Sequence, residues 1–151
     1  MLAALVIGIV AGLRTFTAPA AVGWAARLGW LPLHGTPLAF LGSAAVPWVL
    51  TLLALGEFVG DQLPSTPSRT VPVQFGARLV SGGFSGLAIG LAHGSPVPGL
   101  TAGLIGAVIG TLGGRAARGS LATAFGSDRP AAFLEDGVAV AVALLSVGAL
   151  R

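Results

Sequence analysis

The stretch LVSGGFSGLAIGLAHGSPVPGLTAGLIGAVIGTLGG, residues 79–114, contains no Asp, Glu, Lys or Arg. A helix needs about 20 mostly apolar residues to cross the hydrocarbon core of a bilayer. The motif SPVP at residues 95–98 interrupts the stretch, because proline disfavours a continuous helix. The sequence therefore predicts a hairpin of two transmembrane helices, over roughly residues 73–93 and 98–117.

The composition of the whole chain supports a membrane location. Hydrophobic residues make up 54% of the 151 positions and charged residues 9%, whereas a soluble domain carries about 25% charged residues. A surface in contact with lipid needs no charged cover. The length fits one domain, residues 1–151.

The same composition excludes several classes of site. The chain has no cysteine, and its two histidines lie far apart in the sequence, so we expect no disulfide, metal site or cofactor. The net charge of +3 comes from arginines dispersed between apolar runs. Because they form no basic stripe, we expect no nucleic acid partner.

Two further segments predict spans, and a third is ambiguous. Residues 38–56 carry no charge, and residues 130–150 start at a proline that suits a first helical position. Residues 2–26 reach spanning length only by including Arg14 and Pro19, which favours a broken or re-entrant segment. The predicted fold class is an all-α, polytopic transmembrane helix bundle with four or five spans.

An alternative for the N-terminal segment is a secretory signal. Ala18-Pro19-Ala20 imitates a small-residue cleavage site. A signal peptide, however, has its positive charge before the apolar core, and Arg14 follows it. The membrane segment is the favoured interpretation.

The arginines predict an orientation. In a five-span arrangement one face carries Arg69, Arg115, Arg118 and Arg129, and the opposite face carries Arg27 and Arg151. Positively charged loops tend to stay in the cytoplasm, so the N-terminus is expected there. A re-entrant first segment would reduce the number of spans to four.

Glycines recur at helical spacing in the predicted hairpin. They are Gly82, Gly86 and Gly90 in the first helix, and Gly99, Gly103, Gly106, Gly110 and Gly113 in the second. Faces of small residues let helix backbones approach closely in lipid. We expect close packing between these helices; a homo-oligomer interface or a groove for a ligand are the alternatives.

Charged residues inside the spans predict a buried cluster, since an isolated charge in hydrocarbon costs about 3 kcal/mol or more. The candidates are Arg14, Glu57, Asp61, Arg78, Glu135 and Asp136. In one interpretation they line a pathway in which Glu57 or Glu135 binds a proton or cation and an arginine holds an anionic group. In the other they form a structural network of ion pairs.

The proline-rich loop between the second and third predicted spans carries Ser68 and Arg69. These side chains are candidates for contact with a lipid headgroup, by charge-assisted hydrogen bonds to phosphate. A rigid turn that closes the end of the bundle is the alternative.

Several motifs, in this order, resemble one bacterial family. They are GLR at 12–14, E-x3-D-x2-P-x2-P-x-R-T at 57–70, GAR at 76–78, GGRAAR at 113–118 and EDGVAV at 135–140. The family is known as domain of unknown function 4126, a group of small integral membrane proteins. The resemblance implies a location in the bacterial cytoplasmic membrane and no known activity. Gln62 departs from the family pattern, in which a lysine is expected after the aspartate.

The sequence is compatible with two functions. The first is a carrier or channel that uses the charged cluster to move a small ion or solute, either as a single chain or as a homo-oligomer. The second is a non-transport scaffold or assembly protein of the membrane whose charges are structural. An enzyme acting on lipid headgroups is disfavoured, because the sequence offers no nucleophile–base pair and no metal-binding set.

Overall fold

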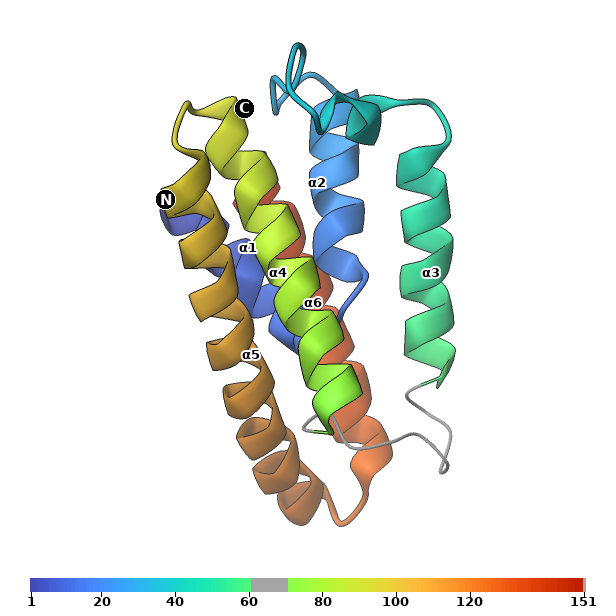
Figure 1. The fold of residues 1–151 in the computed structure, drawn as a ribbon. Helices are drawn as coiled ribbons and strands as arrows, with labels where there is room; N and C mark the ends of the chain where they lie inside the picture. The colour runs from blue at the N-terminus through green and yellow to red at the C-terminus, as the bar shows by residue number, and fades with distance from the viewer. Residues whose placement is uncertain (61–70, 151) are drawn as a thin grey trace.

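A computed structural model describes residues 1–60 and 71–150, and within them all regular secondary structure is helical (Figure 1). The elements are α1 (Leu2–Leu13), α2 (Thr17–Arg27), the short 3-10 helix η1 (Ala39–Gly42), α3 (Val46–Gly60), α4 (Pro72–Ala92), α5 (Pro96–Phe125) and α6 (Asp128–Gly148). The all-α class is confirmed. Asp61, Ser68 and Arg69 lie outside the described residues.

Three helices are long and apolar enough to cross a membrane: α4, α5 and residues Pro130–Gly148 of α6. Helices α4 and α5 both begin at a proline, whose missing N–H is not needed in a first turn. The tight turn between them uses Gly94 at a φ of 67°, which disfavours other residues. The expected pair of helices joined at the SPVP motif is confirmed, but the second, α5, is longer than the predicted range 98–117 and continues to Phe125.

Helices α1 and α2 form a hairpin that turns back inside the bundle. Helix α1 runs parallel to α5, because Leu5 lies beside Gly106 and Ile9 beside Gly110. Helix α2 runs antiparallel to α3, because Trp24 packs edge-on against Trp48 near the start of α3, with ring centroids 5.0 Å apart. Both α3 and α5 begin at the upper end in Figure 1, so α1 descends and α2 returns to that end.

The turn between α1 and α2 lies near the middle of the molecule (Figure 1). Arg14 has an extended backbone there, with φ −141° and ψ 118°. At about 1.5 Å per residue, the 12 residues of α1 rise about 18 Å, roughly half the thickness of a bilayer core. The first segment is therefore broken at Arg14, and α2 runs back toward the end of the bundle at which α1 begins. Pro19 lies in the first turn of α2 and not at the break.

Glycines form the contact between α1, α4 and α5. A Cβ atom added at any of nine glycines would come closer than 3 Å to an atom of a neighbouring helix or turn: Gly8 and Gly12; Gly82, Gly86 and Gly90; Gly99, Gly103, Gly106 and Gly110. On α5, Gly99 and Gly103 face α4, whereas Gly106 and Gly110 face α1. Gly113 does not belong to this contact, because no atom lies within 4 Å of its Cβ position.

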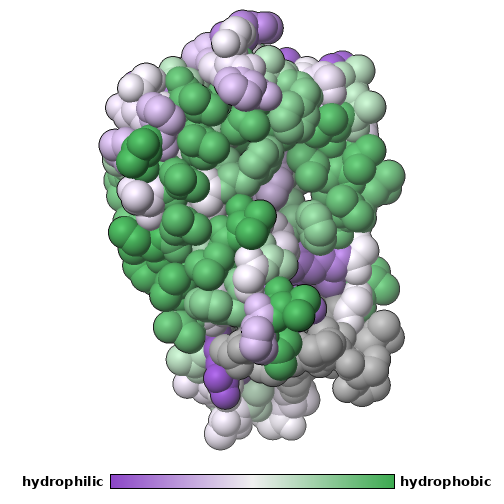
Figure 2. Space-filling model, in the orientation of Figure 1, coloured by the Kyte–Doolittle hydropathy of each residue, from purple (hydrophilic) through white to green (hydrophobic). Residues whose placement is uncertain are grey.

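The outer surface of the bundle is mainly apolar. Figure 2 shows hydrophobic residues over most of the visible face. Large aliphatic side chains such as Leu52, Val59 and Leu145 are about two-thirds exposed or more. Helix α3 packs on α2 and η1 and contributes many of these exposed side chains.

Replacing Gly106 by Ala should destabilise the bundle by about 1–3 kcal/mol, the usual cost of overpacking, because the new methyl group would meet the α1 backbone at Leu5 and Ile9. Replacing Gly113 by Ala is the matched control on the same helix. It should leave stability unchanged or raise it by up to about 1 kcal/mol, since alanine favours a helix over glycine. Unfolding of the two variants in detergent micelles checks this, and equal losses would contradict the packing described.

Candidate functional site

The break between α1 and α2 exposes backbone groups that a continuous helix would pair. The carbonyls of Gly12 and Leu13 end α1, and the amides of Thr15 and Phe16 precede α2. Such groups have no helical partner. In hydrocarbon no water can bind them, so other parts of the protein must do so.

Glu57 of α3 binds both amides. Its Oε1 accepts a hydrogen bond from the Thr15 N–H at 2.7 Å, and its Oε2 accepts one from the Phe16 N–H at 2.9 Å. The carboxylate therefore lies at the N-terminus of α2, where the helix dipole favours a negative charge. It is largely buried, with 11% of its side chain exposed.

Arg78 of α4 binds the carbonyls on the other side of the break. Its Nη1 donates to the Gly12 and Leu13 carbonyl oxygens, both at 2.7 Å. Its Nη2 lies 3.9 Å from Oε1 of Glu57, so the two charged side chains also pair with each other. The guanidinium thus joins the end of α1 to the carboxylate that caps α2.

Two hydroxyl groups complete the backbone contacts. Ser81 Oγ, one turn after Arg78, donates to the Thr15 carbonyl. Thr111 Oγ1 of α5 lies 3.3 Å from the Gly12 carbonyl and 2.8 Å from the Ala107 carbonyl of its own helix. Both residues are buried.

Arg14 occupies the break itself and is fully buried. Its Nη2 forms an ion pair with Oδ1 of Asp136 on α6, and its guanidinium lies 5.6 Å from the centre of the Phe58 ring. A buried charge is tolerated when it is paired in this way, and removing one partner is costly. Helices α3, α4, α5 and α6 therefore each supply a side chain to the break.

The structure brings together four of the sequence candidates: Arg14, Glu57, Arg78 and Asp136. Oε2 of Glu135, the neighbour of Asp136, lies 3.6 Å from Nη1 of Arg118 on α5.

Sequence reasoning missed the hydrogen-bonding roles of Thr15, Phe16 and Thr111. The first two act through backbone amides, which leave no trace in residue identity. The hydroxyl of Thr111 inside a glycine-rich apolar helix was an available signal. Phe58, beside Glu57, was hidden among other apolar residues.

A cavity of about 390 Å³ leads from the side of the bundle to the break. It lies between α3 and α4 and reaches Thr15, Phe16 and Glu57, with Gln74 and Gly60 also in its wall. Figure 2 shows a hydrophilic patch between the apolar surfaces of α4 and α3. The charged break is therefore reachable from outside at the Glu57 side.

The described residues contain no group of three or more His, Asp or Glu side chains placed to hold a metal ion. The site offers hydrogen-bond donors and paired charges.

Arg78→Lys should lower the free energy of unfolding by about 2–4 kcal/mol, because a lysine cannot reproduce the contacts of the guanidinium with two carbonyls and a carboxylate. Arg118→Lys is the matched control. It keeps the charge at an arginine whose side chain is more exposed, 15% against 3%, and should cost less than Arg78→Lys. Denaturation in detergent micelles measures both, and similar losses would contradict the role given to Arg78.

Comparison with known proteins identifies a family without assigning a function. No curated protein and no solved structure matches the chain. The family model described as "Domain of unknown function (DUF4126)" matches residues 1–149. This match confirms the resemblance noted from the motifs: the chain belongs to the DUF4126 family.

Proposed function

We propose that the chain is a polytopic membrane protein that carries a small ion or solute through the break between α1 and α2. The observation that supports this most is the cavity between α3 and α4, which ends at Glu57 and the N-terminus of α2. Interrupted helices that meet inside the membrane are the usual site of substrate and ion binding in transporters.

The proposed topology has four spans and one re-entrant hairpin. Helices α4, α5 and α6 have the length of spanning helices, and α3, although only 15 residues long, is proposed to cross the membrane of a bacterial cell beside them; glycine contacts hold α4 and α5 to α1. Helix α5, which carries Arg115 and Arg118 in its second half, ends at the lower end in Figure 1, and α2, whose last residue is Arg27, ends at the upper end. The lower end is then cytoplasmic by its positive charge. Since α1 begins and α6 ends toward the upper end, this topology replaces the expected cytoplasmic N-terminus with a non-cytoplasmic one.

The chemistry of the break suggests how an ion binds. The backbone amides of Thr15 and Phe16 donate hydrogen bonds to the Glu57 carboxylate, and the Arg78 guanidinium forms an ion pair with it. When Glu57 takes up a proton, it no longer offers two charged acceptor oxygens or balances Arg78. A small anion entering from the cavity then has the same donors available to it.

Charge balance favours coupling the anion to a proton. The charges of Arg14, Arg78, Glu57 and Asp136 sum to zero when all are ionised. An anion that entered alone would leave a net negative charge in a region of low dielectric constant, which is costly. Protonation of Glu57 keeps the sum at zero, so the proposed transport is electroneutral.

Glu57→Gln tests this function in liposomes that contain a pH-sensitive dye. The wild-type protein should acidify the lumen when an inward gradient of chloride, nitrate or phosphate is applied. Glu57→Gln should reduce this flux to the level of protein-free liposomes, because the amide cannot carry the proton. Glu135→Gln is the matched control, since Glu135 pairs with Arg118 away from the cavity.

The result that would overturn the proposal is equal flux in the two variants, or no flux above background in the wild-type protein for any of these anions. Circular dichroism of the Glu57→Gln variant separates loss of flux from loss of folding.

A structural role is the second candidate, and one observation favours it. Glu57 and Arg78 already satisfy the backbone groups of the break, which is enough reason for charges to be buried there. In this case Glu57→Gln unfolds the protein in detergent, and the wild-type protein shows no flux.

A further inference from the structure

A second cavity, of about 260 Å³, lies between α3 and α6 with α2 as its floor. Helices α3 and α6 both pack on α2. The floor consists of Thr17, Ala20, Ala21 and Trp24, which the helical repeat places on one face of α2. This α3–α6 cavity shares no lining residue with the cavity that leads to Glu57.

The α3–α6 cavity is apolar and opens at the outer surface of the bundle. Leu55 of α3 and Leu144 of α6 line it, and both are more than half exposed. None of the side chains that line it, all within the described residues, is charged. The cavity therefore suits a molecule dissolved in the bilayer and not an ion.

One polar group in the wall has no hydrogen-bond partner within the described part of the chain. Thr17 is only 7% exposed, and its Oγ1 is buried without a donor or acceptor. The other polar side chains of the lining are paired, because Trp24 Nε1 donates to Thr51 Oγ1, which itself donates to the Pro47 carbonyl oxygen. A buried hydroxyl without a partner is costly. A rotation of about 120° around the Cα–Cβ bond exchanges the hydroxyl and methyl positions of a threonine, so this hydroxyl can reach a ligand in the cavity.

The position of Thr17 restricts the ligand to a neutral molecule. Thr17 begins α2, next to the break that lies near the middle of the molecule (Figure 1). In the proposed topology this is the middle of the bilayer, where a charged group is costly. From Thr17 the cavity follows α2 to Trp24, over about 10 Å.

The volume and the aromatic walls favour a ring. An apolar cavity of about 150 Å³ is large enough for benzene, so the α3–α6 cavity holds one ring with small substituents. Trp24 and Phe58 both line it, and aromatic side chains pack well against other planar rings. A hydrocarbon tail on the ring can leave between Leu55 and Leu144 into lipid.

We propose that the α3–α6 cavity binds a neutral, lipid-soluble molecule of the quinone class. Its ring lies beside Trp24 and Phe58, and one carbonyl oxygen accepts a hydrogen bond from Thr17. A plain acyl chain fits the apolar walls less well, because it leaves the Thr17 hydroxyl without a partner. Binding here requires only that the protein is inserted in a membrane, so it does not depend on transport through the break.

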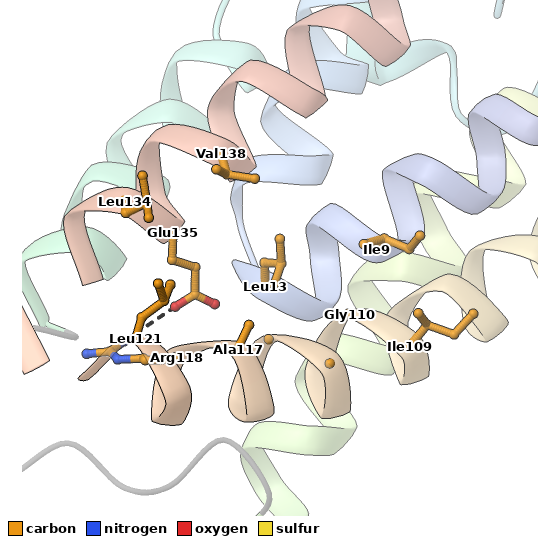
Figure 3. Close-up of a pocket in the computed structure, with 12 residues that line it drawn as sticks. Ile9, Leu13, Ile109, Gly110, Ala117, Arg118, Leu121, Leu134, Glu135 and Val138 are labelled. Carbon is orange, nitrogen blue, oxygen red and sulfur yellow. Dashed lines mark ion pairs between the residues drawn. The ribbon is translucent and has the colours of Figure 1, made fainter. Parts of the chain in front are cut away.

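The groove between α1, α5 and α6 provides a control (Figure 3). It has a volume of about 320 Å³, and the two polar side chains that line it, Arg118 and Glu135, form an ion pair. Gly113 also lines this groove and has no atom within 4 Å of its Cβ position. A larger side chain at Gly113 therefore fills this groove and leaves the α3–α6 cavity unchanged.

Titration calorimetry of the full chain in detergent micelles tests the hydrogen bond with two ligands, decylbenzoquinone and decylbenzene, which share a six-membered ring and a tail. Thr17→Val removes the hydroxyl and keeps the shape of the side chain. It should weaken binding of decylbenzoquinone about fivefold, the usual value of one hydrogen bond, and leave binding of decylbenzene unchanged. Thr101→Val, at an exposed position on α5, is the matched control and should bind both ligands as the wild-type protein does. The chain has no cysteine or lysine, so the quinone meets no side-chain thiol or amine with which to react.

Filling the cavity is a second test. Ala54→Leu on the α3 wall should abolish binding of both ligands, whereas Gly113→Leu should leave it unchanged. Thr17→Val should also unfold in detergent no more readily than the wild-type protein, because its hydroxyl has no hydrogen bond to lose. Its result therefore stands even where Ala54→Leu disturbs the fold.

Three results would overturn the proposal. They are absence of decylbenzoquinone binding by the wild-type protein, equal affinity of Thr17→Val and Thr101→Val for this ligand, and equal losses in Ala54→Leu and Gly113→Leu. A loss in Thr17→Val that is the same for both ligands would assign the effect to packing and reject the hydrogen bond.

Discussion

The turn from α1 to α2 leaves carbonyls and amides that no helix can pair, and satisfying them organises the described part of the bundle. Glu57 binds the amides that precede α2, and Arg78 binds the carbonyls that end α1. Unpaired backbone groups are among the most costly features that a protein can place in hydrocarbon. The position of α3 and α4 around the turn follows from this need. Asp136 on α6 is placed by the charge of Arg14 in the same turn.

The glycine contacts and the break depend on each other. Gly12 packs against α5 at Ala107 and Thr111, and its carbonyl is also the acceptor for Arg78. A larger residue at this point would move the end of α1 away from both partners. The close approach of α1, α4 and α5 thus brings the charged side chains within hydrogen-bonding distance of a backbone that would otherwise be out of reach.

The sequence predicted the elements better than their arrangement. The charge-free stretch 79–114 and its central SPVP motif were enough to place the α4–α5 hairpin, because length and hydropathy decide whether a helix can span. Arg14, Glu57, Arg78 and Asp136 were identified as one cluster, since buried charges must pair. Glu135 pairs with Arg118 of α5, a partner that the sequence did not predict, because the direction of its side chain depends on how α6 is rotated. That rotation is set by packing and not by sequence spacing. The return of α2 toward the start of α1 depends on contacts with α3, α4 and α6, which no local pattern contains.

The central claim is that the first segment turns back inside the bundle at the break held by Glu57 and Arg78. The chain has no cysteine, so single cysteines can be labelled without background. The most direct test labels intact membranes with an impermeant maleimide, using a cysteine in a short N-terminal tag, one at Gly35 and one at Ser127. A re-entrant segment predicts that the tag and position 35 react from one side of the membrane and position 127 from the other. Reaction of the tag and position 35 from opposite sides would show that residues 2–27 span the membrane, and would contradict it.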